Sequence, residues 1–199
     1  MKRLIATLLI AAGLVGLAAA VLYSGAFDIA ADAPHAALTY RILETARNRS
    51  IAVRARDIKV PALDGAQQVA NGAQDYAEMC TDCHLAPGQP DSELRNGLYP
   101  TPPKLTERID ATPGEMFWVI KHGIKLTAMP AWGPTHSDER IWDIVAFLQK
   151  LPDLTLEQYQ ALAGANHDRQ HLHHHDDERE SHAHAGYPLD DIRGAQIHR

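Results

Sequence analysis

The stretch "MCTDCHLAPG", residues 79–88, contains the only two cysteines of this 199-residue chain. Two residues separate the cysteines, and a histidine follows the second one directly. Four chemistries use a cysteine pair at this spacing: a structural disulfide, a redox-active pair, half of a zinc site, and the covalent attachment of heme. The sequence around the cysteine pair indicates which of these chemistries applies.

The surrounding sequence favours heme attachment. A structural zinc ion needs four ligands, and the neighbouring segments offer neither a second C-x-x-C nor a paired histidine motif. A thioredoxin-like redox pair would follow a strand in a βαβ unit, and no such pattern is present. A disulfide between Cys80 and Cys83 would close a very short loop and gain little entropic stabilisation. C-x-x-C-H is the motif of heme attachment, in which both thiols add to the vinyl groups and His84 ligates the iron.

A second axial ligand is expected from the opposite side of the ring, and methionine is the choice in cytochromes c. Met129 is the best candidate of the four methionines, because it lies in the non-helical stretch "HGIKLTAMPAWG" next to Pro130. Met116 lies inside a predicted helix, where we expect it to fill the core. His122 is the alternative distal ligand, although its place in the last turn of that helix also suits the helix dipole.

Three helices and no convincing strand are predicted around these residues. The first, residues 64–79, carries small and apolar residues on one stripe and runs into the cysteines. The second, residues 112–122, begins with a Thr-Pro-Gly-Glu capping box and is followed by Gly123. The third, residues 137–151, begins at a serine followed by two acids and is ended by a proline. Residues 62–152 are therefore predicted to form a small all-α domain.

The N-terminal segment, residues 1–27, is predicted to be a transmembrane helix. Lys2 and Arg3 precede an uncharged run of 24 residues that ends at Phe27, and about 20 apolar residues span a bilayer. A cleaved signal peptide is the alternative, because residues 18–20 are three alanines that offer a cleavage site. Cleavage there would leave an apolar new end, which favours an uncleaved anchor.

Two further segments flank the domain. Residues 28–61 form a connector, with a net charge of +4 over residues 34–61. One or two short amphipathic helices are expected in it, with Leu38, Ile42 and Ala46 at helical spacing. This connector could lie on anionic lipid headgroups or dock on an integral membrane partner.

The C-terminal segment, residues 153–199, is predicted to begin with a short helix and then to form a disordered tail. Eight of the chain's 12 histidines follow Gly164. Binding of copper, zinc or nickel by these histidines is the alternative to a plain hydrophilic extension.

Residues 62–152 resemble a mono-heme class I cytochrome c, similar to small soluble carriers and to the c-type subunits of terminal oxidases. The resemblance rests on Cys80, Cys83 and His84 for heme attachment and proximal ligation, and on Met129 for distal ligation. It also implies that Pro102 or Pro103 supplies a carbonyl that accepts the histidine's N–H. The further matching residues, which belong to two helices that approach each other closely, are Gly72, Tyr76, Trp142 and Phe147.

The resemblance implies one-electron transfer by a covalently attached heme c. An apolar shell around it is expected from Leu98, Leu105, Phe117, Trp118, Ile120, Ile124, Leu126, Trp132 and Ile141, and candidates to steer an acidic partner are Lys104, Lys121 and Lys125. An enzyme with an open distal site is the alternative, against which Met129 argues. The resemblance further implies a bacterial cytoplasmic membrane with the heme domain in the periplasm, and an oxidase, reductase or dehydrogenase as redox partner. The net charge of −6 gives no indication of nucleic-acid binding.

Overall fold

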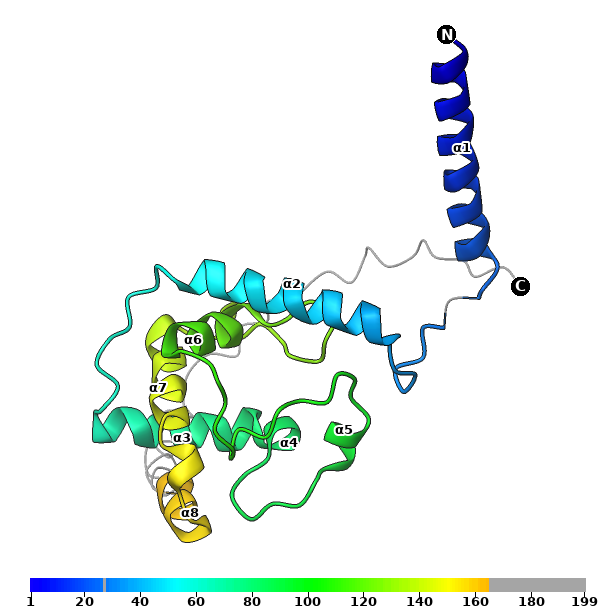
Figure 1. The fold of residues 1–199 in the computed structure, drawn as a ribbon. Helices are drawn as coiled ribbons and strands as arrows, with labels where there is room; N and C mark the ends of the chain where they lie inside the picture. The colour runs from blue at the N-terminus through cyan, green and yellow to red at the C-terminus, as the bar shows by residue number, and fades with distance from the viewer. Residues whose placement is uncertain (27, 165–199) are drawn as a thin grey trace, which may run out of the picture.

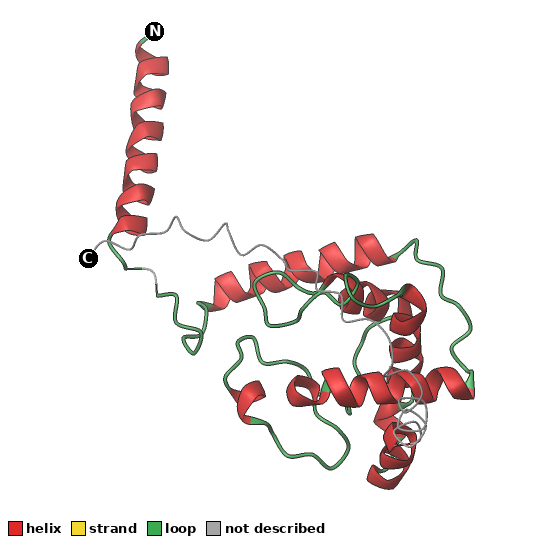
Figure 2. Ribbon diagram, turned by 180° about the vertical axis from the view of Figure 1, so that it is seen from behind, coloured by secondary structure: helices red, strands yellow, loops and turns green. Residues whose placement is uncertain are grey.

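The computed structural model describes residues 1–26 and 28–164, and all the regular structure of these residues is helical (Figures 1 and 2). The prediction of an all-α chain is confirmed for them. The tail that follows Gly164, predicted to be disordered with metal binding as the alternative, lies outside the described residues. In chain order the elements are α1 (Lys2–Tyr23), α2 (Ala37–Ala55), α3 (Ala66–Met79), α4 (Thr81–His84), α5 (Glu93–Asn96), α6 (Pro113–His122), α7 (Asp138–Leu148), the 3-10 helix η1 (Leu151–Asp153) and α8 (Leu156–Gly164).

Helices α3 and α7 cross at the centre of the domain, and the crossing point is a glycine. A Cβ atom added at Gly72 would lie 1.9 Å from the carbonyl oxygen of Asp143, so only glycine allows the two backbones to touch. Tyr76 and Phe147 are fully buried next to this crossing, with ring centroids 5.3 Å apart. Helix α8 packs against the same core through Tyr159. The frame that leads into the cysteines is therefore fixed by helix packing.

A salt bridge joins the same two helices. Arg140 donates from Nε and Nη2 to the two carboxylate oxygens of Asp75 at 2.7 and 2.6 Å. Asp75 is buried, and the bidentate geometry satisfies both of its oxygens. Asn71 adds a hydrogen bond of 3.1 Å to the carboxylate of Asp143. These contacts set the register of α3 against α7.

The start and end of α6 follow the predicted local signals. Thr112 accepts from the backbone N–H of Glu115, and the Glu115 carboxylate accepts in return from the backbone N–H of Thr112. Gly123 ends the helix with φ of 66°, a conformation that L side chains rarely adopt. The third predicted helix is shorter than expected, because α7 ends at Leu148 and Pro152 lies in the separate turn η1.

The connector forms one helix of 19 residues, α2, which is longer than the one or two short helices expected. Its C-terminal end packs on α6, where Ala55 is buried. The predicted apolar stripe is not the packing face, because Leu38 and Ile42 are exposed. Ahead of α2, helix α1 has 22 residues with a mean hydropathy of 2.5 and is the one described helix long and apolar enough to cross a membrane. A signal sequence also has these properties.

Candidate heme site

The two cysteines and the histidine are brought together by a single turn. Cys80 ends α3, and its carbonyl accepts from the backbone N–H groups of Cys83 and His84 at 3.2 and 2.8 Å. Leu85 then reverses the chain with a positive φ of 63°. The buried Tyr76 hydroxyl donates to the Leu85 carbonyl at 2.5 Å, which ties this reversal to the core. Both thiols are free and half-buried, so no disulfide joins them.

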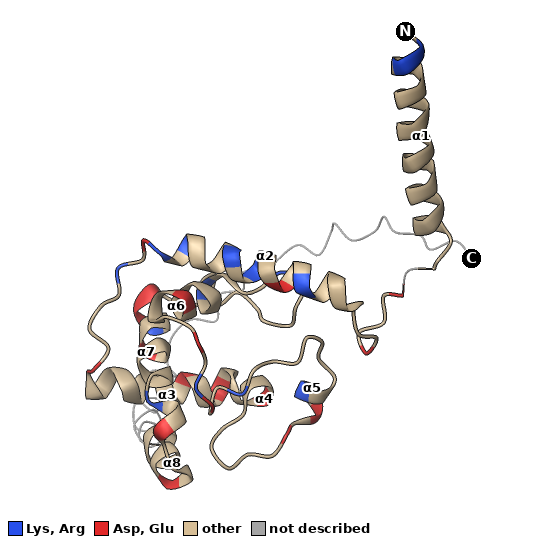
Figure 3. Ribbon diagram, viewed as in Figure 1, with Lys and Arg blue, Asp and Glu red and all other residues tan. Residues whose placement is uncertain are grey.

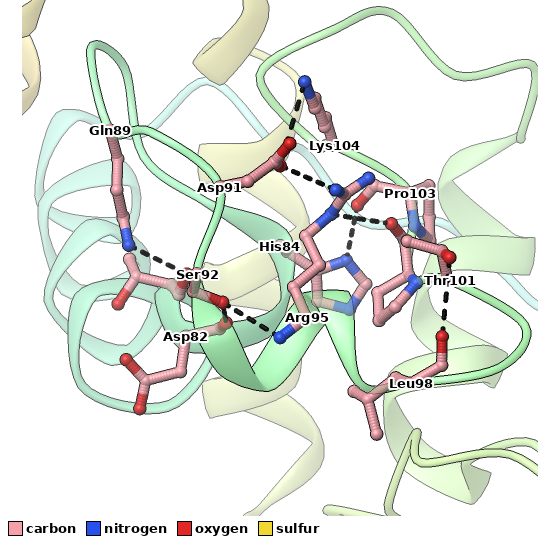
Figure 4. A network of polar contacts seen from close by, with 12 residues as sticks. Asp82, His84, Gln89, Asp91, Ser92, Arg95, Leu98, Thr101, Pro103 and Lys104 are labelled. Atoms are coloured by element: carbon pink, nitrogen blue, oxygen red, sulfur yellow. Dashed lines mark hydrogen bonds and ion pairs between the residues drawn. The ribbon is translucent and has the colours of Figure 1, made fainter. Parts of the chain in front are cut away.

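The imidazole of His84 is held by a backbone carbonyl. Its Nδ1 lies 2.8 Å from the carbonyl oxygen of Pro103, the second of the two predicted prolines (Figure 4). Because a carbonyl only accepts, Nδ1 carries the proton and Nε2 keeps its lone pair. Burial lowers the pKa of His84, an effect that the bond to Pro103 opposes. The ring is thus set as a neutral ligand with Nε2 available.

An arginine that sequence reasoning missed supports this carbonyl segment. Arg95 in α5 donates from Nε to the carbonyl of Pro102 at 3.2 Å and pairs with Asp91 at 2.7 Å (Figure 4). Its side chain is only 12% exposed, and Lys104 lies 3.9 Å from the same carboxylate. Arg95 lies 12 residues beyond Cys83 in a segment without periodicity, so no local signal points to it.

Both thiols have pKa values above their ordinary range. Burial, with a contribution from Asp75, raises the pKa of Cys80 to about 12. Burial and the neighbouring Asp82 also raise the pKa of Cys83. Rapid thiol–disulfide exchange requires a substantial thiolate fraction. The environment of the pair therefore argues against a thioredoxin-like role.

Met129 lies in a loop after α6 that is fixed by its own backbone. The carbonyl oxygen of Met129 accepts from the backbone N–H of Ile124 at 3.1 Å. The backbone N–H of Met129 donates to Oγ1 of Thr127 at 3.1 Å. Gly123 makes the close return possible, since a Cβ there would lie 2.7 Å from the Met129 carbonyl oxygen. The Met129 side chain is half-buried and packs against the core cluster. A thioether is thus presented by an ordered loop.

Two other candidates have different surroundings. The sulfur of Met116 accepts from the amide of Gln149 at 3.2 Å within the core, which fits the predicted role as a filler. His122 is exposed at the end of α6, where its ring lies 5.0 Å from that of Trp118. This position favours the interaction with the helix terminus over a buried ligand role.

One sequence expectation about the surroundings needs correction, and it concerns Lys121. Lys121 was expected to be free to steer a partner. Its Nζ is bound to both carboxylate oxygens of Asp138 at 2.6 and 2.8 Å, so its charge complements the start of α7. Lys125 is exposed as expected. Leu126, which was expected in the apolar shell around the heme, lies in a turn with a positive φ of 61°.

The residues present fit a covalently bound heme. Two uncrosslinked thiols and a neutral histidine share one turn, and the histidine has a fixed donor bond at Nδ1. A methionine is available from an ordered loop that contacts the core. Axial ligation by a histidine whose second nitrogen is held by a carbonyl is what a stable heme iron requires.

Comparison with known protein families also indicates a domain that binds heme covalently. Residues 67–148 match the family model described as "Cytochrome C oxidase, cbb3-type, subunit III". The match runs from α3 through α7 and includes both cysteines, His84 and Met129. A comparison with curated proteins gives no match. Residues 67–148 are therefore a mono-heme c-type cytochrome domain of this family, with a covalently bound heme c as cofactor.

Proposed function

We propose that this chain is a membrane-tethered electron carrier whose heme c is attached to Cys80 and Cys83 and ligated axially by His84 and Met129. The observation that carries the proposal is the 2.8 Å bond from His84 to Pro103, in the turn that follows the cysteines. When bound, the heme supplies a one-electron couple between ferric and ferrous iron. Such a couple suits transfer between respiratory proteins.

The chain's own residues then have definable tasks. The bond to Pro103 keeps the His84 ring in one orientation and one tautomer in both oxidation states. The loop that is closed by the Ile124 and Thr127 hydrogen bonds holds Met129 in place. Side chains of the core cluster, among them Phe117 and Ile120, keep water away from this loop. Little rearrangement then accompanies the arrival or departure of an electron.

Anchoring by α1 is part of the proposal. Lys2 and Arg3 favour a cytoplasmic start for the helix, and the resemblance places heme attachment on the outer face of the bacterial cytoplasmic membrane. Residues 28–164 would then lie in the periplasm, where an oxidase, reductase or dehydrogenase exchanges electrons with the heme. The family description favours an oxidase complex as the context.

The ligand set is tested by substituting Met129→Ala in the full chain. We expect the ferric protein to lose the weak far-red absorption band of methionine-ligated iron, and the reduction potential to fall, because a thioether stabilises ferrous iron. Met116→Leu is the matched control, since it removes another half-buried methionine of the domain and should leave both properties intact. Absence of the band from the unmodified ferric protein, or an unchanged spectrum and potential in Met129→Ala, would contradict the assignment.

A further inference from the structure

Helix α2 is attached to the cytochrome domain at both of its ends. At its C-terminal end, the Ala55 carbonyl oxygen lies 3.3 Å from the position of a Cβ on Gly114, and the Ile58 side chain lies 3.7 Å from that position. Just before the helix, the backbone N–H of His35 donates to the Tyr99 hydroxyl at 3.2 Å, and the two rings meet edge to face. The helix is therefore a rigid part of the domain rather than a loose tether.

The opposite side of α2 carries three exposed apolar residues that have no partner among the described residues. Leu38, Ile42 and Val53 are 71%, 59% and 48% exposed. At 100° per residue these three positions fall within about 60° of one another around the helix axis. We call them the outer stripe. A water-facing stripe of this kind costs solvation free energy unless another phase or molecule covers it.

Cations accompany the outer stripe. Blue segments recur along α2 in Figure 3, and the segment 37–59 contains six Lys and Arg residues against two acids. Arg47 pairs with Glu44, and Arg56 pairs with Asp57. Arg41 and Arg49 form no ion pair with any residue that the structure describes. At 100° per residue Arg49 falls within the same sector of the helix as the outer stripe, and its long side chain can reach past the apolar residues to a charged layer.

The position of α2 in the chain identifies what covers the stripe. Helix α1 ends at Tyr23, and only residues 24–36 separate it from α2. This segment spans at most about 45 Å when fully extended. In Figures 1 and 2, α1 stands across the direction of α2 instead of continuing it. A helix tethered this close to a membrane span, with exposed apolar residues on its outer side and cations among and around them, can lie in the plane of the membrane interface.

We propose that α2 lies flat on the bilayer that contains α1, with the outer stripe among the lipid chains and its arginines on anionic phospholipid headgroups. This inference rests on the proposed anchoring by α1. Because α2 is packed on α6 and bound at Tyr99, docking of α2 fixes the orientation of the whole cytochrome domain towards the membrane. Of the two occupants that the sequence left open, an anionic lipid surface is the one that the structure favours.

The test uses the full, heme-loaded protein in nanodiscs with a nitroxide label in place of Val53. Collision of the label with oxygen, which concentrates in lipid, is compared with collision with a water-soluble nickel complex. Discs contain either phosphatidylcholine alone or equal parts of phosphatidylcholine and phosphatidylglycerol. A label at Gln160, exposed on α8 at the far side of the domain, is the matched control.

We expect the Val53 label to be shielded from nickel and exposed to oxygen in the anionic discs, and to become more aqueous in phosphatidylcholine or at high salt. The Gln160 label should stay aqueous throughout. Substitution of Arg49→Gln should lower the ratio of protein with a lipid-exposed Val53 label to protein with a water-exposed label by about fivefold. Lys150→Gln makes the same charge change away from α2 and should leave the ratio unchanged.

Three results would overturn the proposal. If the Val53 label stays in an aqueous environment while the protein is bound to the disc, α2 does not dock on the lipid, and the anchoring by α1 still holds. A label shielded from both probes in every lipid shows that a protein covers the stripe. Protein that stays out of the discs excludes the anchoring of α1 together with this inference, while the visible spectrum reports separately whether heme is attached.

Discussion

Replacement of Gly72 by alanine tests whether the α3–α7 crossing holds the cytochrome domain together. The added Cβ would lie 1.9 Å from the Asp143 carbonyl oxygen and 2.9 Å from the backbone nitrogen of Ile144. Real Cβ atoms keep at least 3.0 Å from such atoms, so the α7 backbone has to retreat by about 1.1 Å at this point. Backbone cannot rotate away as a flexible side chain can. The shift therefore spreads to the packing of Tyr76 and Phe147.

The expected cost follows from two opposing effects. Overpacking of a core costs about 1–3 kcal/mol, and a rigid backbone obstacle puts this site at the upper end. Alanine is the better helix former and returns up to about 1 kcal/mol. We expect Gly72→Ala to lower the free energy of unfolding by about 2 kcal/mol, measured by urea titration of the heme-loaded protein with far-ultraviolet circular dichroism.

The control is Gly164→Ala, also a helical glycine, whose added Cβ would meet no atom of the described residues within 4 Å. This variant should be unchanged or slightly more stable, because only the helix propensity changes. If Gly72→Ala unfolds at the same urea concentration as the unmodified protein, the close crossing of α3 and α7 is not the feature that stabilises the domain.

Three further substitutions test other parts of the account. Thr112→Ala removes the capping box of α6 and should cost about 1 kcal/mol in a urea titration without altering the visible spectrum; an unchanged midpoint would contradict a stabilising cap. Arg140→Met leaves the buried Asp75 carboxylate without its bidentate partner and should cost about 2 kcal/mol. The added change Asp75→Asn should recover part of that loss, and strict additivity of the two changes would argue against a coupled pair. Arg95→Gln removes a positive charge that also lowers the pKa of His84, so the reduction potential measured by spectroelectrochemistry should fall, with partial rescue by Arg95→Lys. A potential equal to that of the unmodified protein in Arg95→Gln would show that this charge does not act on the site.

The features that sequence reasoning predicted well are local in the chain. The capping box at Thr112, the end of α6 at Gly123 and the buried stripe of α3 each depend on residues within a few positions of one another. The family resemblance added one long-range contact, the bond between His84 and a proline carbonyl, and the structure places it at Pro103. Short-range chemistry and a known motif were sufficient for these elements.

The features that sequence reasoning missed depend on tertiary contacts. Asp75 and Arg140 pair across 65 positions, and no periodicity relates them. The connector illustrates the same limit, because helical spacing identified Leu38 and Ile42 as a stripe but could not show that a different face packs on α6.

The central claim is that a heme is bound covalently through both cysteines of the turn at residues 80–83. The direct measurement is a pyridine hemochrome spectrum of denatured protein after extraction with acidic acetone, which removes heme that is not covalently attached. The account predicts that one heme per chain remains with the spectrum of a doubly thioether-linked heme, and that Cys80→Ala shifts this spectrum to that of a single linkage. Protein that loses all of its heme to the acetone, after expression with a working heme-attachment system, would contradict the claim.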